Sequence, residues 1–242
     1  MTKQELWMQK RIGMITASEL SNITSASGKI IDGNISYIRR KRFERNHGYG
    51  LPVSSHTMDV GNETEPMIFE WLKANHENDF LVYSKDLPEI PFWVSEDCPF
   101  GASPDSFTED EETVFEFKTL VGNEATEFFC DPYTSYEEKK ARVWKDHGDQ
   151  ILGLMLSNRK VQKVILIKYA PQRDDILTDT DSPLAGWRGS VFYFSRKDYE
   201  ASIAEMRKRI ILFDAMIDAP VNPSEFKSGQ WYLTADGELK VK

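Results

Sequence analysis

Three residues near the middle of the chain have types and a spacing that could support chemistry. Glu116 and Lys118 lie two residues apart in a strand-like segment, 113–120, and Asp105 precedes it. Side chains alternate along a strand, so Glu116 and Lys118 share one face while the adjacent phenylalanines point to the other. An acidic turn at 109–112 would close a hairpin and return Asp105 beside Glu116. Two carboxylates and an ammonium would then converge.

Such a group suits metal-assisted cleavage of a phosphodiester. Carboxylate oxygens are preferred ligands of Mg²⁺. One ion can polarise the phosphate and activate water, and two can stabilise both the attacking and the leaving oxygen. A lysine beside them can orient the water or offset developing negative charge. The spacing alone is explained more simply by a charged hairpin with an exposed salt bridge, because strands often carry Glu-x-Lys on a solvated face.

Composition predicts a globular domain in a reducing cytosol. The chain has 242 residues, enough for one sizeable core. It has no run approaching the about 18 apolar residues of a membrane span, and residues 1–10 lack the apolar core of a signal peptide. Cys98 and Cys130 have no CxxC spacing, which disfavours a zinc or iron–sulfur site. We therefore expect one domain over 1–242, with a core at about 7–219 and a tail at 220–242.

The net charge of −9 argues against a uniformly DNA-binding surface, but local patches decide binding. Basic residues form two clusters, either of which could be a DNA contact or a solvated helix face. The denser one contains Arg39, Arg40, Lys41, Arg42 and Arg45, and the second contains Lys139, Lys140, Arg142 and Lys145. We predict DNA contacts for the arginines of the first cluster.

Hydrophobic patterning predicts an α/β fold with a central mixed sheet flanked by helices. Helices are expected from Thr16, which has capping-box spacing to Glu19, and over about 34–46, 57–78, 123–130, 136–158 and 195–219. Strands are expected at about 80–84, 92–95, 113–120, 161–169 and 190–194, with a long polar connection at 171–189.

Five short motifs, taken together, carry a resemblance. They are Trp7 followed by Arg11-x-Gly-x-Ile-Thr-Ala-Ser18, then Gly61-x-x-x-Glu65, Ser103-Pro-Asp105, Glu116-x-Lys118 and Gln150. In this order they resemble the lambda-exonuclease (viral recombinase) family of the PD-(D/E)xK nuclease superfamily. Each motif is weak by itself, whereas five in order are specific. The resemblance covers nearly the whole chain up to about residue 219 and implies a restriction-endonuclease-like core.

The resemblance also implies roles for the catalytic residues. Asp105, Glu116, Glu65 and the backbone carbonyl of Phe117 would hold metal, and Lys118 would position the attacking water. Glu63 is the near alternative to Glu65, because Pro66 leaves the register of that helix open.

A second group would bind phosphate. Arg11 and Ser18 match the family residues that hold a terminal 5′-phosphate, and Ser103 matches a serine that helps bind the scissile or terminal phosphate. Gln150 matches a glutamine that faces the active site, and we expect it to contact phosphate as well. A helix beginning near Thr16 would add backbone N–H groups for the same anion.

The activity implied by the resemblance is that of a phage recombination nuclease. It would use one or two Mg²⁺ ions, or Mn²⁺, to degrade one strand of linear duplex DNA from the 5′ end. A 3′ overhang would remain for a single-strand annealing protein, and the family implies a ring-shaped trimer. Three alternatives stay open: an endonuclease or repair nuclease of the same fold, a DNA-binding module without catalysis, and, remotely, a carboxylate-based glycosidase.

Overall fold

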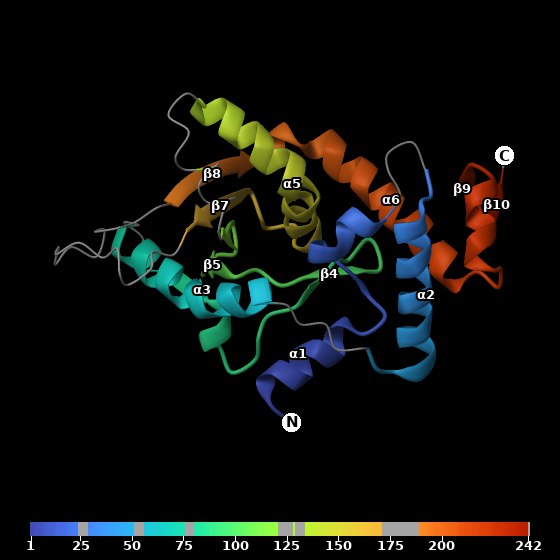
Figure 1. Ribbon diagram of the computed structural model, residues 1–242, viewed down its shortest axis with the longest axis horizontal. Helices are drawn as coiled ribbons and strands as arrows, with labels where there is room; N and C mark the ends of the chain where they lie inside the picture. The colour runs from blue at the N-terminus through green and yellow to red at the C-terminus, as the bar shows by residue number, and fades with distance from the viewer. Residues whose placement is uncertain are drawn as a thin grey trace.

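A five-stranded mixed β-sheet lies at the centre of the fold, as predicted (Figure 1). The computed structural model describes residues 1–23, 29–50, 56–75, 80–120, 128, 134–170 and 189–241. Its strands are β2 (Leu81–Tyr83), β5 (Ser106–Thr108), β6 (Thr113–Thr119), β7 (Lys163–Tyr169) and β8 (Gly189–Ser195), in the spatial order β2-β5-β6-β7-β8. The β6–β7 pair is parallel and the other three pairs are antiparallel.

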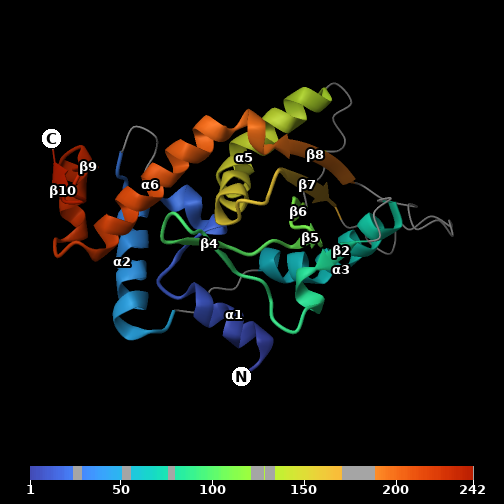
Figure 2. The same cartoon turned by 180° about the vertical axis from the view of Figure 1, so that it is seen from behind.

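Helices cover both faces of this sheet, as the two views in Figures 1 and 2 show. Helices α5 (Tyr136–Ser157) and α6 (Glu200–Asp218) lie on one face, and α3 (His56–Asn75) lies on the other. The alternation of side chains along β6 produces these two layers. Val114 packs in the larger hydrophobic cluster, with residues of α5 and α6, while Phe115 and Phe117 pack against Ile68 of α3 in the smaller one.

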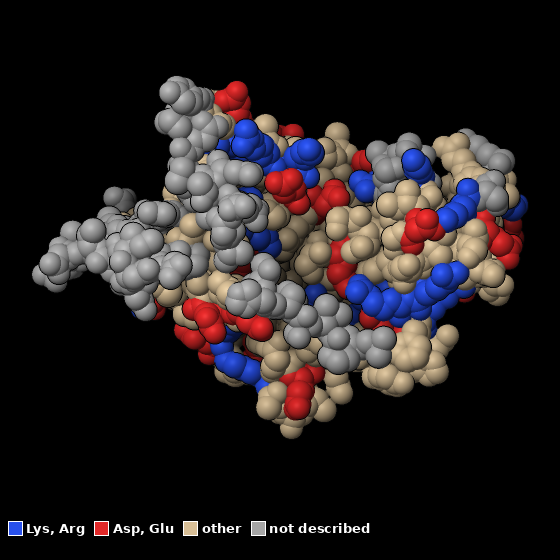
Figure 3. All heavy atoms as spheres, in the orientation of Figure 1, with Lys and Arg blue, Asp and Glu red and all other residues tan. Residues whose placement is uncertain are grey.

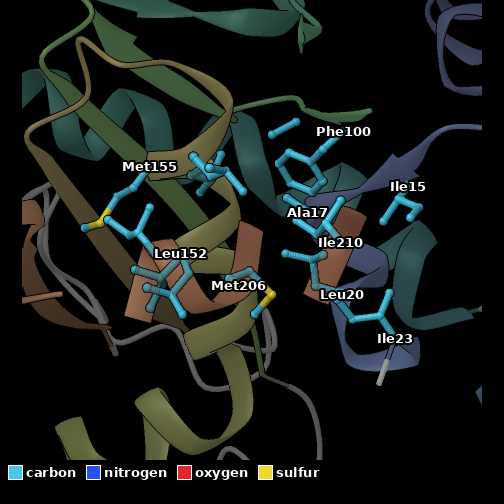
Figure 4. Packing of buried hydrophobic residues seen from close by; sticks show 14 of the residues in the cluster. Ile15, Ala17, Leu20, Ile23, Phe100, Leu152, Met155, Met206 and Ile210 are labelled. Atoms are coloured by element: carbon cyan, nitrogen blue, oxygen red, sulfur yellow. The ribbon is translucent and has the colours of Figure 1, made fainter. Parts of the chain in front are cut away.

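A second, three-stranded sheet fixes the N-terminal segment against α5. Its strands are β1 (Ile15–Thr16), β4 (Phe100–Ala102) and β3 (Trp93–Val94), in the order β1-β4-β3. The 3₁₀ helix η1 (Ala17–Asn22) follows β1 and packs on α5, where Ala17, Leu20 and Phe100 converge (Figure 4). A Cβ at Gly153 of α5 would lie within 3.0 Å of all three side chains, so only glycine permits this close approach.

The C-terminal residues pack on the basic helix α2 (Asp32–His47) and on α6. They form η5 (Pro223–Ser228) and a hairpin of β9 (Trp231–Leu233) with β10 (Leu239–Val241). Figure 1 shows these elements side by side. Phe226 is fully buried in the larger hydrophobic cluster, so the tail contributes to the core rather than lying beside it.

The helix predicted to start at Thr16 is a short 3₁₀ helix without a side-chain cap, and the last long helix begins later than predicted. An α-helix, α1 (Lys3–Arg11), ends before Thr16, which is instead followed by the short η1. Thr16 does contact Glu19, but hydroxyl to carboxylate at 2.8 Å rather than as a helix cap. The last long helix begins at Glu200, after the 3₁₀ turn η4 (Arg196–Asp198).

A predicted helix and a predicted connection involve residues that the structure mostly does not describe. The expected helix at 123–130 and the connection at 171–188 lie outside the described residues, except for Phe128. Within the described ranges, every helix is too short or too polar to cross a lipid bilayer.

Candidate active site

The β5–β6 hairpin brings Asp105 beside the strand that carries Glu116 and Lys118. Residues 106 and 115 are paired in the antiparallel ladder, and Asp105 lies just before it. The Asp105 Oδ2 atom accepts a hydrogen bond from the backbone N–H of Phe117 at 2.7 Å. The convergence of the two carboxylates and the lysine, predicted from the turn and the alternation, is therefore present in the fold.

Glu116 is held by two donors that come from different elements. Its side chain is 3% exposed, and its Oε1 atom accepts from Lys118 Nζ at 2.7 Å and from Gln150 Nε2 at 2.6 Å. Gln150 lies on α5, so the packing of α5 on the sheet completes this part of the site. No donor among the described residues reaches the buried Oε2 atom of Glu116.

Helix α3 supplies the third carboxylate. Glu65 is partly buried, and its negative charge acts on both Asp105 and Glu116. Lys85 forms an ion pair with Glu65. Glu63 is exposed on the same helix, so of the two alternatives Glu65 is the one that the structure brings to the other carboxylates.

The electrostatics of this group favour bound protons or cations. Burial, Glu116 and Glu65 together hold the pKa of Asp105 well above its usual value. Burial also raises the pKa of Glu116, although the Lys118 ammonium opposes the shift. For Lys118, burial alone would lower the pKa, but Glu116 and Asp105 outweigh burial and raise it. Lys118 therefore remains protonated and acts as a cation or proton donor.

The residues present fit a divalent cation chemically. A buried carboxylate oxygen with no described donor, Glu116 Oε2, is an atom that a cation would satisfy. Asp105 and Glu65 add hard oxygen donors. Within the described ranges, no three His, Cys, Asp or Glu side chains stand in a metal-holding geometry. Lys118 pairs with Glu116, and Lys85 pairs with Glu65. The metal ligands, including the Phe117 carbonyl, stay a prediction.

The predicted phosphate-binding residues form a second group. Arg11, at the end of α1, donates to Ser18 Oγ at 3.2 Å and to Thr16 Oγ1 at 3.3 Å. Trp7 connects this group to Ser103: its indole N–H donates to Ser103 Oγ at 2.6 Å, and the Arg11 guanidinium lies 4.3 Å from its ring centroid. The structure thus brings Arg11, Ser18 and Ser103 together.

A pocket between η1 and α5 links the phosphate group to the carboxylates. Its volume is about 390 Å³, and Ser18 and Gln150 both line it. Gln150 also donates to Glu116, so an anion contacting Gln150 or Ser18 there would lie close to the catalytic group. Its other lining residues include Lys145, His147 and two carboxylates, Asp146 and Asp149.

The arginines of α2 are used within the fold. Arg42 donates to three backbone carbonyls around the end of α6, and Arg45 donates to the Gly13 carbonyl at 2.9 Å and pairs with two aspartates of α6. Arg40 pairs with Glu19 and Glu44. Arg39 is exposed, and it donates to Ser224 Oγ at 2.8 Å.

Basic atoms do form a band across the region of α2 on the face shown in Figure 3. The internal contacts nevertheless give Arg40, Arg42 and Arg45 a structural role that the sequence analysis did not predict. DNA contact by this cluster stays a prediction, and Arg39, the most exposed of the four arginines, is the one placed to make it.

Sequence reasoning missed several residues of the site. Trp7 lay within a recognised motif but received no role. Lys85 and His147 follow no motif. Burial, Lys118 and Lys168 lower the pKa of His147 to about 3, so its ring is neutral near pH 7. Lys168 is paired with Lys118 across β6 and β7, and a buried lysine within a hydrophobic strand was the signal that could have located it.

The mixed sheet with helices on both faces is a fold that solved exonuclease structures share. The chain matches no protein-family profile and no curated protein. Solved structures do share its fold, which confirms the fold class and the resemblance seen in the motifs.

An alkaline exonuclease from Laribacter hongkongensis has a TM-score of 0.63 and 18% identity, over 93% of this chain and 95% of that one. The same enzyme in complex with dAMP has a TM-score of 0.59 and 18% identity, over 88% and 94%. A phage-related exonuclease from Haemophilus somnus 129PT has a TM-score of 0.58 and 14% identity, over 84% and 95%. At such identities the likeness establishes a shared fold.

Proposed function

We propose that this chain is a metal-dependent exodeoxyribonuclease that hydrolyses phosphodiester bonds from the ends of linear double-stranded DNA. The observation that carries the proposal is the convergence of Asp105, Glu116, Lys118 and Gln150. Asp105 lies just before β5, Glu116 and Lys118 lie on β6, and Gln150 lies on α5. A solvated surface hairpin does not account for this convergence or for the burial of Glu116. The exonucleases that share the fold support the same reading.

The carboxylates would bind Mg²⁺, or Mn²⁺, as one or two ions. Asp105, Glu116 and Glu65 would supply side-chain oxygens, and the Phe117 carbonyl would add a fourth. The bound cation supplies Lewis acidity at the phosphate and lowers the pKa of water.

The chain's own residues perform the remaining tasks. Lys118, kept protonated by Glu116 and Asp105, places positive charge where the attacking water and the phosphate oxygens would lie. Gln150, on α5, donates to the Oε1 atom of Glu116, and no described donor occupies its Oε2 atom. Both contacts preorganise the site before substrate arrives.

The polarity of digestion is proposed from the second group of residues. Arg11 and Ser18, with Ser103 held by Trp7, would bind a terminal 5′-phosphate. A guanidinium and hydroxyl groups suit a phosphate dianion. Digestion would then proceed from the 5′ end and leave a 3′ overhang for recombination by strand annealing. An annealing protein and further copies of this chain, as a trimer, are the partners that we propose.

The first test uses linear duplex DNA labelled at one end. Substrates with 5′-phosphate or 5′-hydroxyl ends, and a covalently closed circle, are incubated with Mg²⁺ or with chelator, and Asp105→Asn is the control. We expect Mg²⁺-dependent loss of the 5′-phosphorylated strand, intact circles and no activity in Asp105→Asn.

Other results would favour the alternatives. Cut circles would make the protein an endonuclease with the same site. Binding without cleavage under any metal would favour a DNA-binding module, and the exonuclease proposal would fail.

A further inference from the structure

Two lysines flank the carboxylate group from different elements. Lys118 lies on β6 and pairs with Glu116. Lys85 lies in the 3₁₀ turn η2 (Ser84–Asp86), directly after β2, and pairs with Glu65 of α3. Its ammonium also donates to Asn62 Oδ1, again on α3, at 3.0 Å. The chemistry proposed above uses Lys118 and leaves Lys85 without a task.

The backbone around Lys85 is fixed to the segment that carries Asp105. The Ser84 N–H donates to the Asp105 carbonyl at 3.1 Å, and the Ser84 hydroxyl donates to the Pro104 carbonyl at 2.6 Å. The turn that bears Lys85 is therefore anchored to the catalytic hairpin. The side chain itself is 36% exposed, so its ammonium can move while its backbone stays in place.

The two ion pairs differ in their exposure. The Lys118–Glu116 pair includes a carboxylate that is 3% exposed, and breaking it would leave a buried charge. In the Lys85–Glu65 pair, the Lys85 side chain is 36% exposed and the Glu65 side chain 18% exposed, although the Glu65 Oε2 atom that faces Lys85 is buried. Such partly exposed pairs are weak and exchange readily. Lys85 is thus the lysine of the two that can leave its carboxylate.

We propose that Lys85 is a positioning residue that exchanges between Glu65 and a DNA backbone phosphate. It neutralises Glu65 when no cation is bound, and it is released when a divalent cation takes that carboxylate. The released ammonium then lies beside the carboxylate group and contacts a phosphate of the bound strand. This inference rests on the proposed function, because it assumes that Glu65 is a metal ligand and that the substrate is DNA.

The exchange predicts that loss of Lys85 increases metal affinity, whereas a purely structural role for Lys85 predicts a decrease. Loss of Lys85 removes a cation that competes for Glu65, so the metal should bind more tightly. Structural damage at the site would instead weaken metal binding. In the presence of metal, DNA should bind less tightly, and the slope of log affinity against log salt should become shallower by about 1, as for one lost phosphate contact.

The experiment compares Lys85→Met and Lys85→Arg with the unaltered chain. Mn²⁺ affinity is measured by calorimetry without DNA. The affinity for a short 5′-phosphorylated duplex is measured by fluorescence anisotropy, in Ca²⁺ and in chelator. Lys240→Met is the matched control: it removes the same charge from an exposed pair with Glu238 in the β9–β10 hairpin, at the other side of the molecule from α3 (Figure 1).

For Lys85→Met we expect threefold to tenfold tighter Mn²⁺ binding, a threefold to tenfold loss of DNA affinity in Ca²⁺, and little change in chelator. Lys85→Arg and Lys240→Met should both resemble the unaltered chain in Mn²⁺ binding. Thermal denaturation of each variant establishes that it is folded.

The outcomes separate this inference from the function on which it rests. Absence of Mn²⁺ binding by the unaltered chain would overturn the metal-dependent function itself. Normal Mn²⁺ binding that Lys85→Met leaves unchanged or weakens would overturn the exchange alone. Tighter Mn²⁺ binding with unchanged DNA affinity would also overturn it, because Lys85 would then be only a counter-ion of Glu65.

Discussion

Replacing Arg42 with methionine should destabilise the protein while leaving DNA affinity intact. The Arg42 guanidinium donates to the carbonyls of Ile217 and Val221, each at 2.6 Å, and of Met216 at 2.8 Å. These bonds close the end of α6 and hold the segment that leads into η5. Methionine retains much of the aliphatic stem, so the substitution removes mainly the hydrogen bonds and the charge.

The magnitude follows from the contacts. A net contribution of about 1 kcal/mol for each hydrogen bond gives about 3 kcal/mol for the three. The favourable position of a cation at a helix C-terminus adds about 0.3–1 kcal/mol. The partial exposure of the side chain weakens its hydrogen bonds by a similar amount, so the total stays near about 3 kcal/mol. For a domain of this size, about 3 kcal/mol corresponds to a fall in Tm of about 6–12 °C.

The assay combines urea and thermal denaturation with duplex binding. Arg39→Met is the matched control on the same helix, because Arg39 is exposed and has one hydrogen bond, to Ser224. Its unfolding free energy should change by less than about 1 kcal/mol. If α2 contacts DNA, Arg39→Met is the variant that loses affinity. An Arg42→Met protein of unchanged stability and weakened DNA binding would refute the structural role.

Three more predictions test the site. Lys118→Met should lower kcat by about 10²–10³-fold, the usual effect of losing one stabilising donor, and a binding assay should show that duplex affinity is retained. Normal turnover together with lost duplex binding would exclude a catalytic role for Lys118. Arg11→Ala should abolish any preference for 5′-phosphorylated over 5′-hydroxyl ends in a paired digestion, and a persisting preference would exclude Arg11 from the phosphate site. Because burial and neighbouring carboxylates raise the pKa of Asp105, protons compete with the cation, so calorimetric Mn²⁺ affinity should rise as pH rises through that pKa. By the same shift, metal-free stability should fall over that pH window, and Asp105→Asn should lessen the fall; a flat pH dependence of both quantities would contradict the carboxylate cluster.

The catalytic hairpin was predictable because its signals are local. The alternation of residues 113–119 assigns each side chain to a face, and the acidic turn sets the distance back to Asp105. Period-two alternation is a direct consequence of strand geometry, so no tertiary information was needed. The order of the five motifs then indicated the fold that the solved structures confirm.

Helix boundaries near the N-terminus were less accessible. Helix α1 contains no fully buried residue, so its sequence lacks the apolar stripe that marks a helix against a core. Its capping box, Thr2 with Glu5, was the one strong local signal. The Thr16 and Glu19 pair has the same spacing, but tertiary contacts of Glu19 with Arg40 and Lys41 give it another use.

The partners of the basic residues of α2 could not be predicted from the charge pattern of the sequence. Consecutive arginines point in different directions around a helix, and each direction meets a different neighbour. Arg42 meets the carbonyls at the end of α6, and Arg45 meets Asp214 and Asp218, more than 160 residues away in sequence. Net or clustered charge carries no information about these partners.

The hairpin, the residue types of the site and the class of fold could be predicted without coordinates, since these depend on periodicity and on motifs within a few residues. Three contacts became visible only in the folded chain: Glu65 of α3 faces the other carboxylates, Gln150 donates to Glu116, and Lys85 pairs with Glu65. Those contacts join side chains from elements far apart in the chain, and their geometry is set by how α3 and α5 pack on opposite faces of one sheet.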